Sequence, residues 1–193
     1  IFNVSGHKFG MVYPGIGWLI FRESDDLPED LVFYENYLGK RDATFTLNFS
    51  RPGNQIVGQY FNFIRLGREG YTSIMETLRL VATTLSSRIA DLGPFELITD
   101  GSQIPVFAVR CKEGTPFTVF DVSDHLRRDG WQVPAYTMPP NREDLVVLRV
   151  VVRNGFSHDM AELFLRDLVA AIEWLDDLDG PLPLEAQPEG FSH

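Results

Sequence analysis

The stretch YTSIMETLRLVATTLSSRIADLG, residues 71–93, carries an apolar side chain at every third or fourth position. This is the period of a helix that buries one face. Gly93 closes the stretch, as glycine commonly does at the end of a helix. The sequence therefore predicts a long amphipathic helix that needs apolar partners along one side. Its predicted buried positions are Ile74, Leu78, Val81, Leu85 and Ile89.

After this helix, short apolar runs alternate with helical patterns. FELITD, PVFAVRCK, WQVPAYTM and DLVVLRVVV have the length and composition of strands, and TVFDVSDHLRRDG reads as a helix stopped by Gly130. Ser157 can cap a closing helix, HDMAELFLRDLVAAIEWLDDL. We predict that this helix buries one side, formed by Met160, Leu163, Leu168, Ile172 and Leu175.

The part before the long helix is less regular. IFNVS and GWLIFR read as strands, residues 23–53 as mostly irregular chain, and residues 54–70 as a short, heavily buried helix. We therefore predict four parts: 1–70 as the end of a larger domain, 71–93 as a linking helix, 94–180 as a small α+β domain, and 181–193 as a mobile C-terminal tail. The first residue is Ile within a strand-like stretch, so we interpret the chain as part of a longer or processed polypeptide.

Composition excludes several classes of function. The net charge of −10 argues against nucleic acid and anionic membranes as partners. The same charge means that an acidic substrate would need a local cationic site. The four histidines and one cysteine have no metal-ligand spacing, so no metal is expected. The single Cys111 cannot form an internal disulfide, which fits a cytoplasmic protein.

Four residues are candidates for chemistry, although each has an ordinary alternative. Lys8 in SGHKFG is on its own a surface charge, and Ser50 in NFSRPG is on its own a turn residue. Arg149 interrupts an apolar strand and should therefore meet an anion, either an internal carboxylate or a ligand. His193 ends a polar, proline-containing tail, where a histidine is usually inert.

Five motifs place these residues in context. SGHKFG, YPGIGWLIFR, LVFYENYLG, TFTLNFSRPGNQ and RLGREGY follow one another in an order and spacing that resemble the pyridoxal-phosphate-dependent glutamate decarboxylases, of the aspartate-aminotransferase-like fold. The resemblance covers essentially the whole chain, to the terminal GFSH. Gly6 rather than Pro precedes the His-Lys pair, which favours the glutamate branch over the aromatic amino acid decarboxylases. The resemblance implies an α/β fold of type I, here the end of the large domain plus a small C-terminal α+β domain.

The resemblance also implies roles for residues near the cofactor, pyridoxal 5′-phosphate. Lys8 corresponds to the lysine that holds the cofactor as a Schiff base, a task that requires an amine. His7 corresponds to a catalytic histidine beside the cofactor. Ser5 and Ser50 correspond to phosphate donors, and Ser50 reaches its site across a dimer interface in the family.

Two further roles concern the substrate and the tail. Arg149 corresponds to the arginine that binds the substrate α-carboxylate, which a guanidinium can hold through two parallel hydrogen bonds. His193 corresponds to a histidine near the C-terminus that closes the active site at neutral pH. Histidine suits such a switch because its charge changes between about pH 5 and 8.

Three functions remain open at this point. The first is decarboxylation of L-glutamate to 4-aminobutyrate, by a chain that is a fragment and inactive alone. The second is decarboxylation of another amino acid, and the third is a non-catalytic dimerisation or interaction fragment. The resemblance implies an amino acid substrate, a homodimer or larger homo-oligomer, and completion by the missing N-terminal part of the same protein. Because the tail is acidic and lacks a basic helix, we expect no calmodulin binding.

Overall fold

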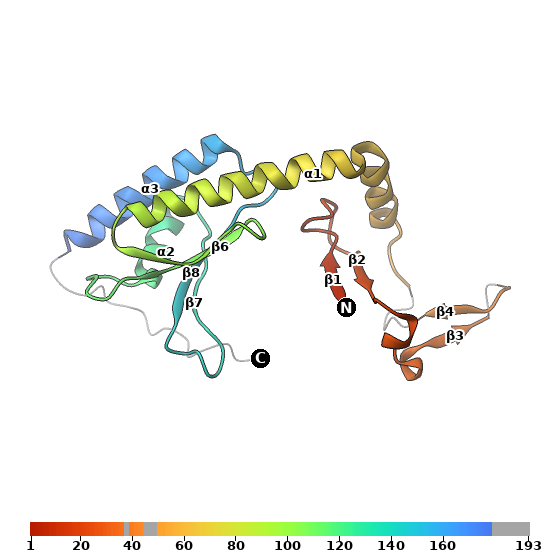
Figure 1. Cartoon of the computed structure of the whole chain (residues 1–193). Coiled ribbons are helices and arrows are strands. Elements are labelled where there is room, and N and C mark those ends of the chain that lie inside the picture. The colour runs from red at the N-terminus through yellow and green to blue at the C-terminus, as the bar shows by residue number, and fades with distance from the viewer. Residues whose placement is uncertain (37–38, 45–49, 179–193) are drawn as a thin grey trace. The chain divides into compact units, whose positions relative to one another are not determined.

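The computed structural model describes residues 1–36, 39–44 and 50–178, which divide into two compact units. The first unit runs from Ile1 to Tyr71 and the second begins at Thr72 (Figure 1). One long helix, α1 (Asn54–Asp91), belongs to both units and is interrupted at Gly67, whose φ of 57° and ψ of −167° are not helical. Each unit is described by itself below.

The second unit is built on a four-stranded antiparallel sheet. Its strands are β5 (Phe95–Asp100), β6 (Val106–Cys111), β7 (Ala135–Thr137) and β8 (Val146–Val151), in the order β5-β6-β8-β7 (Figure 1). Two helices complete the unit, α2 (Val119–Arg128) and α3 (His158–Asp176). The predicted alternation of strands and helices after residue 94 is thus present, although β7 is short.

One face of this sheet carries the apolar core. Phe107 and Val109 of β6 lie opposite Val150 and Leu148 of β8, and all four are buried. Side chains of α1, α2 and α3 join them in a single cluster. The face of α1 predicted from its period is confirmed, because Leu78, Val81, Leu85 and Ile89 are buried and Ile74 packs against the cluster.

Helix α3 begins as predicted, and its predicted buried residues Leu168, Ile172 and Leu175 are buried. Ser157 accepts a hydrogen bond from the backbone N–H of Met160, as a capping residue does. Met160 and Leu163, however, are exposed, so their prediction as buried residues was wrong. In the first turns of the helix the buried positions are Ala161, Phe164 and Leu165 in their place. The full buried face, on a helix that contacts α2, consists of Ala161, Phe164, Leu165, Leu168, Ala171, Ile172 and Leu175.

The first unit contains two antiparallel hairpins and the start of α1. Strands β1 (Phe2–Ser5) and β2 (Gly17–Ile20) form the hairpin that contains Lys8. Strands β3 (Phe33–Glu35) and β4 (Asp42–Thr44) form another, preceded by the short 3-10 turns η1 (Ser24–Asp26) and η2 (Glu29–Leu31). The prediction of mostly irregular chain over 23–53 therefore missed this second hairpin.

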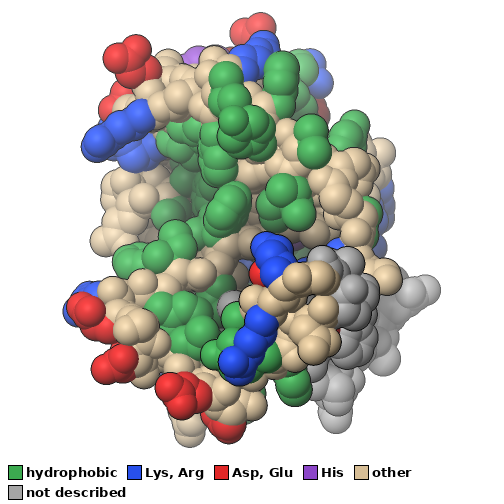
Figure 2. Space-filling view, turned by 90° about the vertical axis from the view of Figure 1, so that its right-hand side faces the viewer, with side chains coloured by type: hydrophobic (Ala, Val, Ile, Leu, Met, Phe, Trp, Pro, Cys, Tyr) green, Lys and Arg blue, Asp and Glu red, His purple; other side chains and the backbone are tan. Residues whose placement is uncertain are grey.

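The helix before Gly67 is present, but it is not heavily buried as predicted. Its apolar side chains other than the half-buried Leu66 are exposed, and its buried side chain is the polar Gln59, at 1% exposure. Apolar side chains also gather on the face of the molecule seen in Figure 2. The exposed apolar residues of this helix are Ile56, Val57, Tyr60, Phe61, Phe63 and Ile64.

Candidate active site

Lys8 lies in a compact turn that connects β1 to β2. The backbone N–H of Gly6 donates to the carbonyl of Ile16 at 3.0 Å, and the N–H of Val12 donates to the carbonyl of Gly6 at 3.3 Å. Within the turn, the N–H of Lys8 donates to Ser5 and the carbonyl of Lys8 accepts from Met11, both at 3.2 Å. The backbone of Lys8 is therefore hydrogen bonded on both sides.

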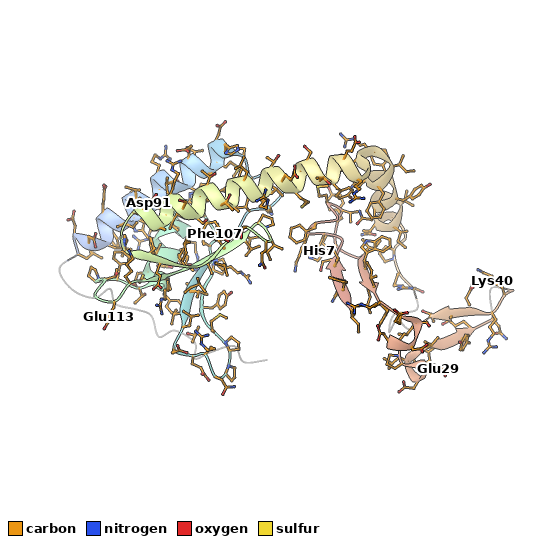
Figure 3. The ribbon with its side chains drawn as sticks, in the orientation of Figure 1. His7, Glu29, Lys40, Asp91, Phe107 and Glu113 are labelled. Carbon is orange, nitrogen blue, oxygen red and sulfur yellow. The ribbon has the colours of Figure 1, made fainter. Side chains whose placement is uncertain are left out.

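The side chains of this turn are available to a ligand. His7, which is labelled in Figure 3, and Lys8 are exposed, and Ser5 is half-buried. Lys8 makes no ion pair with any carboxylate in the described ranges 1–36, 39–44 and 50–178. Residues 1–22 contain no Asp or Glu, in a chain whose net charge is −10. The turn is therefore a locally cationic segment of an acidic chain, which is what an anionic ligand requires.

Three polar side chains of α1 hold this hairpin, and we call Gln55, Gln59 and Asn62 the polar stripe. Gln55 Nε2 donates to the carbonyl of Pro14 at 3.0 Å, Gln59 Nε2 to that of Gly10 at 2.9 Å, and Asn62 Nδ2 to that of Met11 at 2.8 Å. The sequence analysis missed these residues. Their spacing of four and three within an otherwise apolar helix is the signal that could have revealed them.

The remaining predicted site residues lie elsewhere. Ser50 is exposed and belongs to the first unit. Arg149 belongs to the second unit and is itself exposed, although Leu148 and Val150 on either side of it are buried. It sits opposite Ala108 of β6, on the sheet face away from the core, with its guanidinium carbon 5.4 Å from the ring centre of Tyr136. His193 lies outside the described residues.

Arg149 makes no ion pair with any Asp or Glu in the part of the chain that the structure describes. The strand tolerates this charge because alternate side chains of a strand point to opposite faces of a sheet. Leu148 and Val150 face the core, whereas Arg149 between them does not. The sequence left two alternatives for the anion that meets Arg149, an internal carboxylate and a ligand. No internal carboxylate partner is found among these residues.

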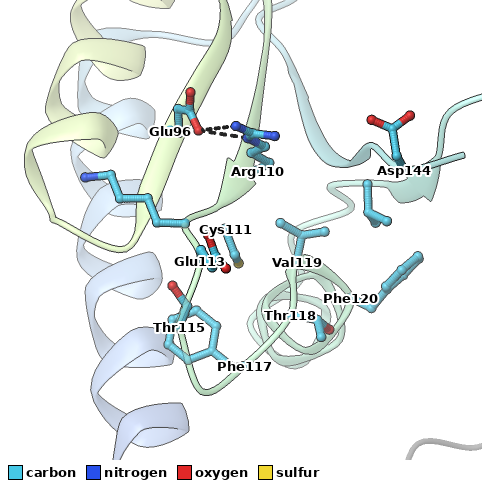
Figure 4. Close-up of a pocket in the computed structure, with 12 residues that line it drawn as sticks. Glu96, Arg110, Cys111, Glu113, Thr115, Phe117, Thr118, Val119, Phe120 and Asp144 are labelled. Atoms are coloured by element: carbon cyan, nitrogen blue, oxygen red, sulfur yellow. Dashed lines mark hydrogen bonds and ion pairs between the residues drawn. The ribbon is translucent and has the colours of Figure 1, made fainter. Parts of the chain in front are cut away.

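A pocket of about 420 Å³ in the second unit contains none of the predicted site residues (Figure 4). Its lining includes the Glu96–Arg110 ion pair, Cys111 and Asp144. Burial raises the pKa of the Cys111 thiol to about 11, with a smaller contribution from the charge of Asp121. The thiol is thus protonated at neutral pH and a poor nucleophile.

Metal and membrane sites are not found in the described part of the chain. No group of three or more His, Cys, Asp or Glu side chains there could hold a metal ion. No helix formed by those residues is both long enough and apolar enough to cross a membrane.

Solved structures share this fold. The glutamate decarboxylase of Lactobacillus brevis CGMCC 1306 matches with a TM-score of 0.84 and 44% identity, over 91% of this chain and 40% of that one. The sphingosine-1-phosphate lyase of Burkholderia pseudomallei K96243 matches with a TM-score of 0.68 over 89% of this chain and 37% of that one, and at 23% identity it supports the fold alone. The predicted α/β fold, that of the type I pyridoxal-phosphate enzymes, is confirmed.

The family follows from the sequence of the same region. The pattern described as "Pyridoxal-dependent decarboxylase conserved domain" matches residues 1–112, so the chain belongs to the pyridoxal-dependent decarboxylase family. A glutamate decarboxylase of Aliivibrio fischeri (strain ATCC 700601 / ES114) is 53% identical over 99% of this chain and 42% of that protein. One from Solanum lycopersicum is 48% identical over 95% and 37%. The chain thus spans about two fifths of the length of these relatives.

The residues of the Lys8 turn fit the cofactor of this family, pyridoxal 5′-phosphate. An aldehyde needs an accessible amine that is not already engaged with a carboxylate, and Lys8 offers one. A phosphate needs hydroxyl or cationic donors without competing acids, and Ser5, His7 and the acid-free segment 1–22 provide this. The resemblance to the family and the predicted cofactor are therefore confirmed.

Proposed function

We propose that the protein is a glutamate decarboxylase, a carboxy-lyase that converts L-glutamate to 4-aminobutyrate and carbon dioxide. The observation that carries this proposal is the Lys8 turn. Its lysine is exposed, unpaired with any described carboxylate and fixed by backbone hydrogen bonds. The chain that carries this lysine is 53% identical, over 99% of its length, to a protein named glutamate decarboxylase.

The first unit supplies the cofactor side of the proposed site. When bound, pyridoxal 5′-phosphate withdraws electrons from the α-carbon of an amino acid, which makes the loss of CO₂ possible. Lys8 would hold the aldehyde of the cofactor through its amine. Ser5 and Ser50 would donate their hydroxyls to the phosphate, and His7 would lie beside the cofactor. The exposure of Lys8, His7 and Ser50 supports these roles.

The second unit supplies the proposed substrate arginine. Arg149 would bind the α-carboxylate of glutamate through its planar guanidinium and so orient the bond that breaks. Its exposure and its lack of a carboxylate partner among the described residues support this role. Residues such as Arg88 and Arg110, in contrast, are engaged with Glu162 and Glu96.

The whole protein would act as a homo-oligomer in the cytoplasm, completed by sequence that precedes the Lys8 motif in the relatives.

His193 would approach the cofactor when its imidazole is neutral and leave as it becomes protonated. Deletion of residues 189–193 should then extend decarboxylation toward neutral pH. An unchanged pH profile would show that His193 does not close the site.

Covalent trapping tests the central role of Lys8. The longest form of the protein that takes up pyridoxal 5′-phosphate is reduced with borohydride, digested and mapped by mass spectrometry. We expect the cofactor to be fixed on the Lys8 peptide. In Lys8→Ala, both this fixation and the release of CO₂ from L-glutamate should be lost. Lys40→Ala is the matched control, because Lys40 is an exposed lysine paired with Asp42 at 3.0 Å. Cofactor that stays fixed to the protein in Lys8→Ala would exclude the proposal.

Replacement of Arg149 tests the substrate side. Lysine keeps the charge but loses the two parallel donors, so Arg149→Lys should lower kcat/KM for L-glutamate roughly 100-fold while the melting temperature stays the same. Arg153→Lys, in the exposed chain just after β8, is the control and should have little effect. A lower melting temperature with unchanged kcat/KM would show that Arg149 serves the fold instead.

A further inference from the structure

Two side chains of α1, Gln59 and Tyr71, form a closed hydrogen-bonded group with the turn of Lys8, and its centre is Gln59. Gln59 Nε2 donates to the carbonyl of Gly10 at 2.9 Å and to the hydroxyl of Tyr71 at 3.0 Å. That hydroxyl in turn donates to the same carbonyl of Gly10 at 3.0 Å. Gly10 is two residues beyond Lys8 in the chain. Both amide hydrogens of Gln59 are therefore used to hold one peptide of the turn.

Gln59 occupies this position at a cost to stability. It is only 1% exposed, and its Oε1 has no hydrogen-bond partner within the described chain. Leaving a buried polar atom unpaired is unfavourable, because the atom loses its hydrogen bonds to water on burial. An apolar side chain of similar size would avoid that cost. The glutamine is thus best explained by the two donors that it directs at the turn and at Tyr71.

The neighbouring peptide is held in the same way. Met11 has a φ of 55°, which side-chain-bearing residues seldom adopt, and Asn62 Nδ2 donates to its carbonyl at 2.8 Å. Tyr71 is itself supported by Phe63, whose ring centre is 5.8 Å away and which also packs on Trp18 of β2 at 5.7 Å. The segment that follows Lys8 is therefore fixed to α1 at two successive carbonyls.

This arrangement compensates for the freedom of the lysine side chain. An exposed lysine has a flexible four-carbon stem, so the position of its amine depends on how well its backbone is fixed. The strand β1 and the Gly6–Ile16 hydrogen bond fix the chain before Lys8. The hydrogen bonds of Gln59, Tyr71 and Asn62 fix it afterwards.

We propose that Gln59 and Tyr71 are positioning residues that set where the Lys8 amine meets its carbonyl ligand, by holding the Gly10 peptide. This inference rests on the proposed function, because it assumes that Lys8 holds the cofactor. It assigns to Gln59 and Tyr71 no contact with the cofactor or the substrate. Their effect passes through the backbone between Gly10 and Lys8.

The test compares matched variants of the protein loaded with pyridoxal 5′-phosphate. Gln59→Met keeps the length of the side chain and removes both donors, and Tyr71→Phe removes a single oxygen. Gln55→Met is the control, because Gln55 lies on the same stripe and donates at 3.0 Å to Pro14, six residues beyond Lys8. The readouts are the pH midpoint of the absorbance of the bound cofactor, the rate of borohydride fixation at Lys8, and kcat and KM for L-glutamate.

We expect Gln59→Met and Tyr71→Phe to shift the pH midpoint, slow fixation and lower kcat by about tenfold or more with little change in KM, since small displacements of a reacting group have large effects on rate. Gln55→Met should resemble the wild type in all readouts. If Gln59→Met does not fold, Tyr71→Phe decides the question. Wild-type behaviour of Tyr71→Phe, or equal effects in Gln55→Met and Gln59→Met, would overturn the positioning role.

The outcome for Lys8 separates this inference from the proposed function. If Lys8→Ala loses the fixed cofactor while Gln59→Met and Tyr71→Phe behave as wild type, only the positioning role is wrong. If Lys8→Ala retains the fixed cofactor, the proposed function itself is wrong and the positioning role is wrong with it.

Discussion

The two units of this chain are stabilised in different ways. Among the described residues, every buried apolar side chain belongs to the second unit, from Leu78 onward. The first unit buries Gln59 instead and fixes its hairpin through side-chain donors to backbone carbonyls. The comparison teaches that burial of apolar surface defines the fold of the second unit, whereas hydrogen bonds define the local conformation around Lys8.

The exposed apolar side chains of the first unit fit this difference. The side of α1 that carries Val57, Phe61 and Ile64 contributes little hydrophobic stabilisation, because its surface is not removed from water. The side of the same helix that faces the hairpin carries the polar stripe and, beside it, Phe63, which packs on Trp18. Most apolar side chains of this helix segment are thus exposed, whereas its polar stripe contacts the hairpin.

The largest expected effect is a truncation in the core of the second unit. Phe107 is fully buried at the centre of the sheet, so Phe107→Ala should lower the free energy of unfolding by about 3–5 kcal/mol. The matched change in the first unit, Phe61→Ala, should alter it by less than about 0.5 kcal/mol, because Phe61 is 60% exposed. Denaturant unfolding followed by circular dichroism measures both, and equal losses would contradict the comparison.

A smaller effect is expected from crowding the turn of the first unit. A Cβ added at Gly10 would overlap Gln59 Oε1 and lie 2.6 Å from the carbonyl oxygen of Gly6. Gly10→Ala should therefore destabilise the turn by about 1–3 kcal/mol. Hydrogen exchange of the Met11 amide, which donates to Lys8, is the local measurement.

The control for this change is Gly53→Ala, just before α1. A Cβ added at Gly53 meets nothing within 4 Å, and its φ does not require glycine. The exchange rate of Met11 should stay the same in this variant. Similar acceleration in both variants would show that the packing of Gln59 against Gly10 does not hold the turn.

The contrast between the units also explains what the sequence could predict. The apolar period of residues 71–93 revealed the buried face of α1 because tertiary packing there follows the pattern of apolar side chains. The same reasoning assigned Met160 and Leu163 to the buried side of α3, although both are exposed and the neighbouring Phe164 and Leu165 are buried. Periodicity indicates that a helix has an apolar side, but not which of two adjacent apolar rows meets the partner.

Predictions failed where burial does not decide the structure. The β3–β4 hairpin was missed because Phe33 and Tyr34 are exposed and leave no buried pattern. The apolar neighbours of Arg149 are buried, but their pattern did not show that Arg149 itself is exposed, because the core covers only one face of the sheet. Gln59 was missed because its role depends on a turn about 50 residues away, with which it forms a hydrogen bond. The motif around Lys8, in contrast, identified the candidate site from the sequence.

A helix cap in the second unit should matter less than its core. Ser157 accepts from the N–H of Met160, so Ser157→Ala should cost about 1 kcal/mol. The melting temperature should fall by roughly 2–4 °C in a protein of this size. Ser87→Ala, at an exposed interior position of α1, is the control and should not lower it, because alanine favours helix. A loss in Ser87→Ala as large as in Ser157→Ala would contradict a capping role.

The smallest expected effect is a pH-dependent contribution at the rim of the second unit. Trp131 Nε1 donates to Asp167 Oδ2 at 2.8 Å, and this hydrogen bond, together with Arg166, lowers the pKa of Asp167. A carboxyl whose pKa is lowered in the folded state stabilises the fold above its unfolded pKa of about 3.9, and this stabilisation is lost as the pH falls through the folded pKa. Asp167→Asn keeps an oxygen acceptor but removes the charge. It should therefore lower the free energy of unfolding by no more than about 1 kcal/mol at pH 7, and the difference from the wild type should vanish in acid. Trp131 fluorescence during denaturant unfolding, at pH values from 7 to 2, measures this difference in the free energy of unfolding.

Asp124→Asn controls for the loss of one surface charge, since Asp124 meets Arg127 only at 4.0 Å. A difference that persists at pH 2, or that Asp124→Asn reproduces, would show that the charge of Asp167 contributes nothing specific to the fold.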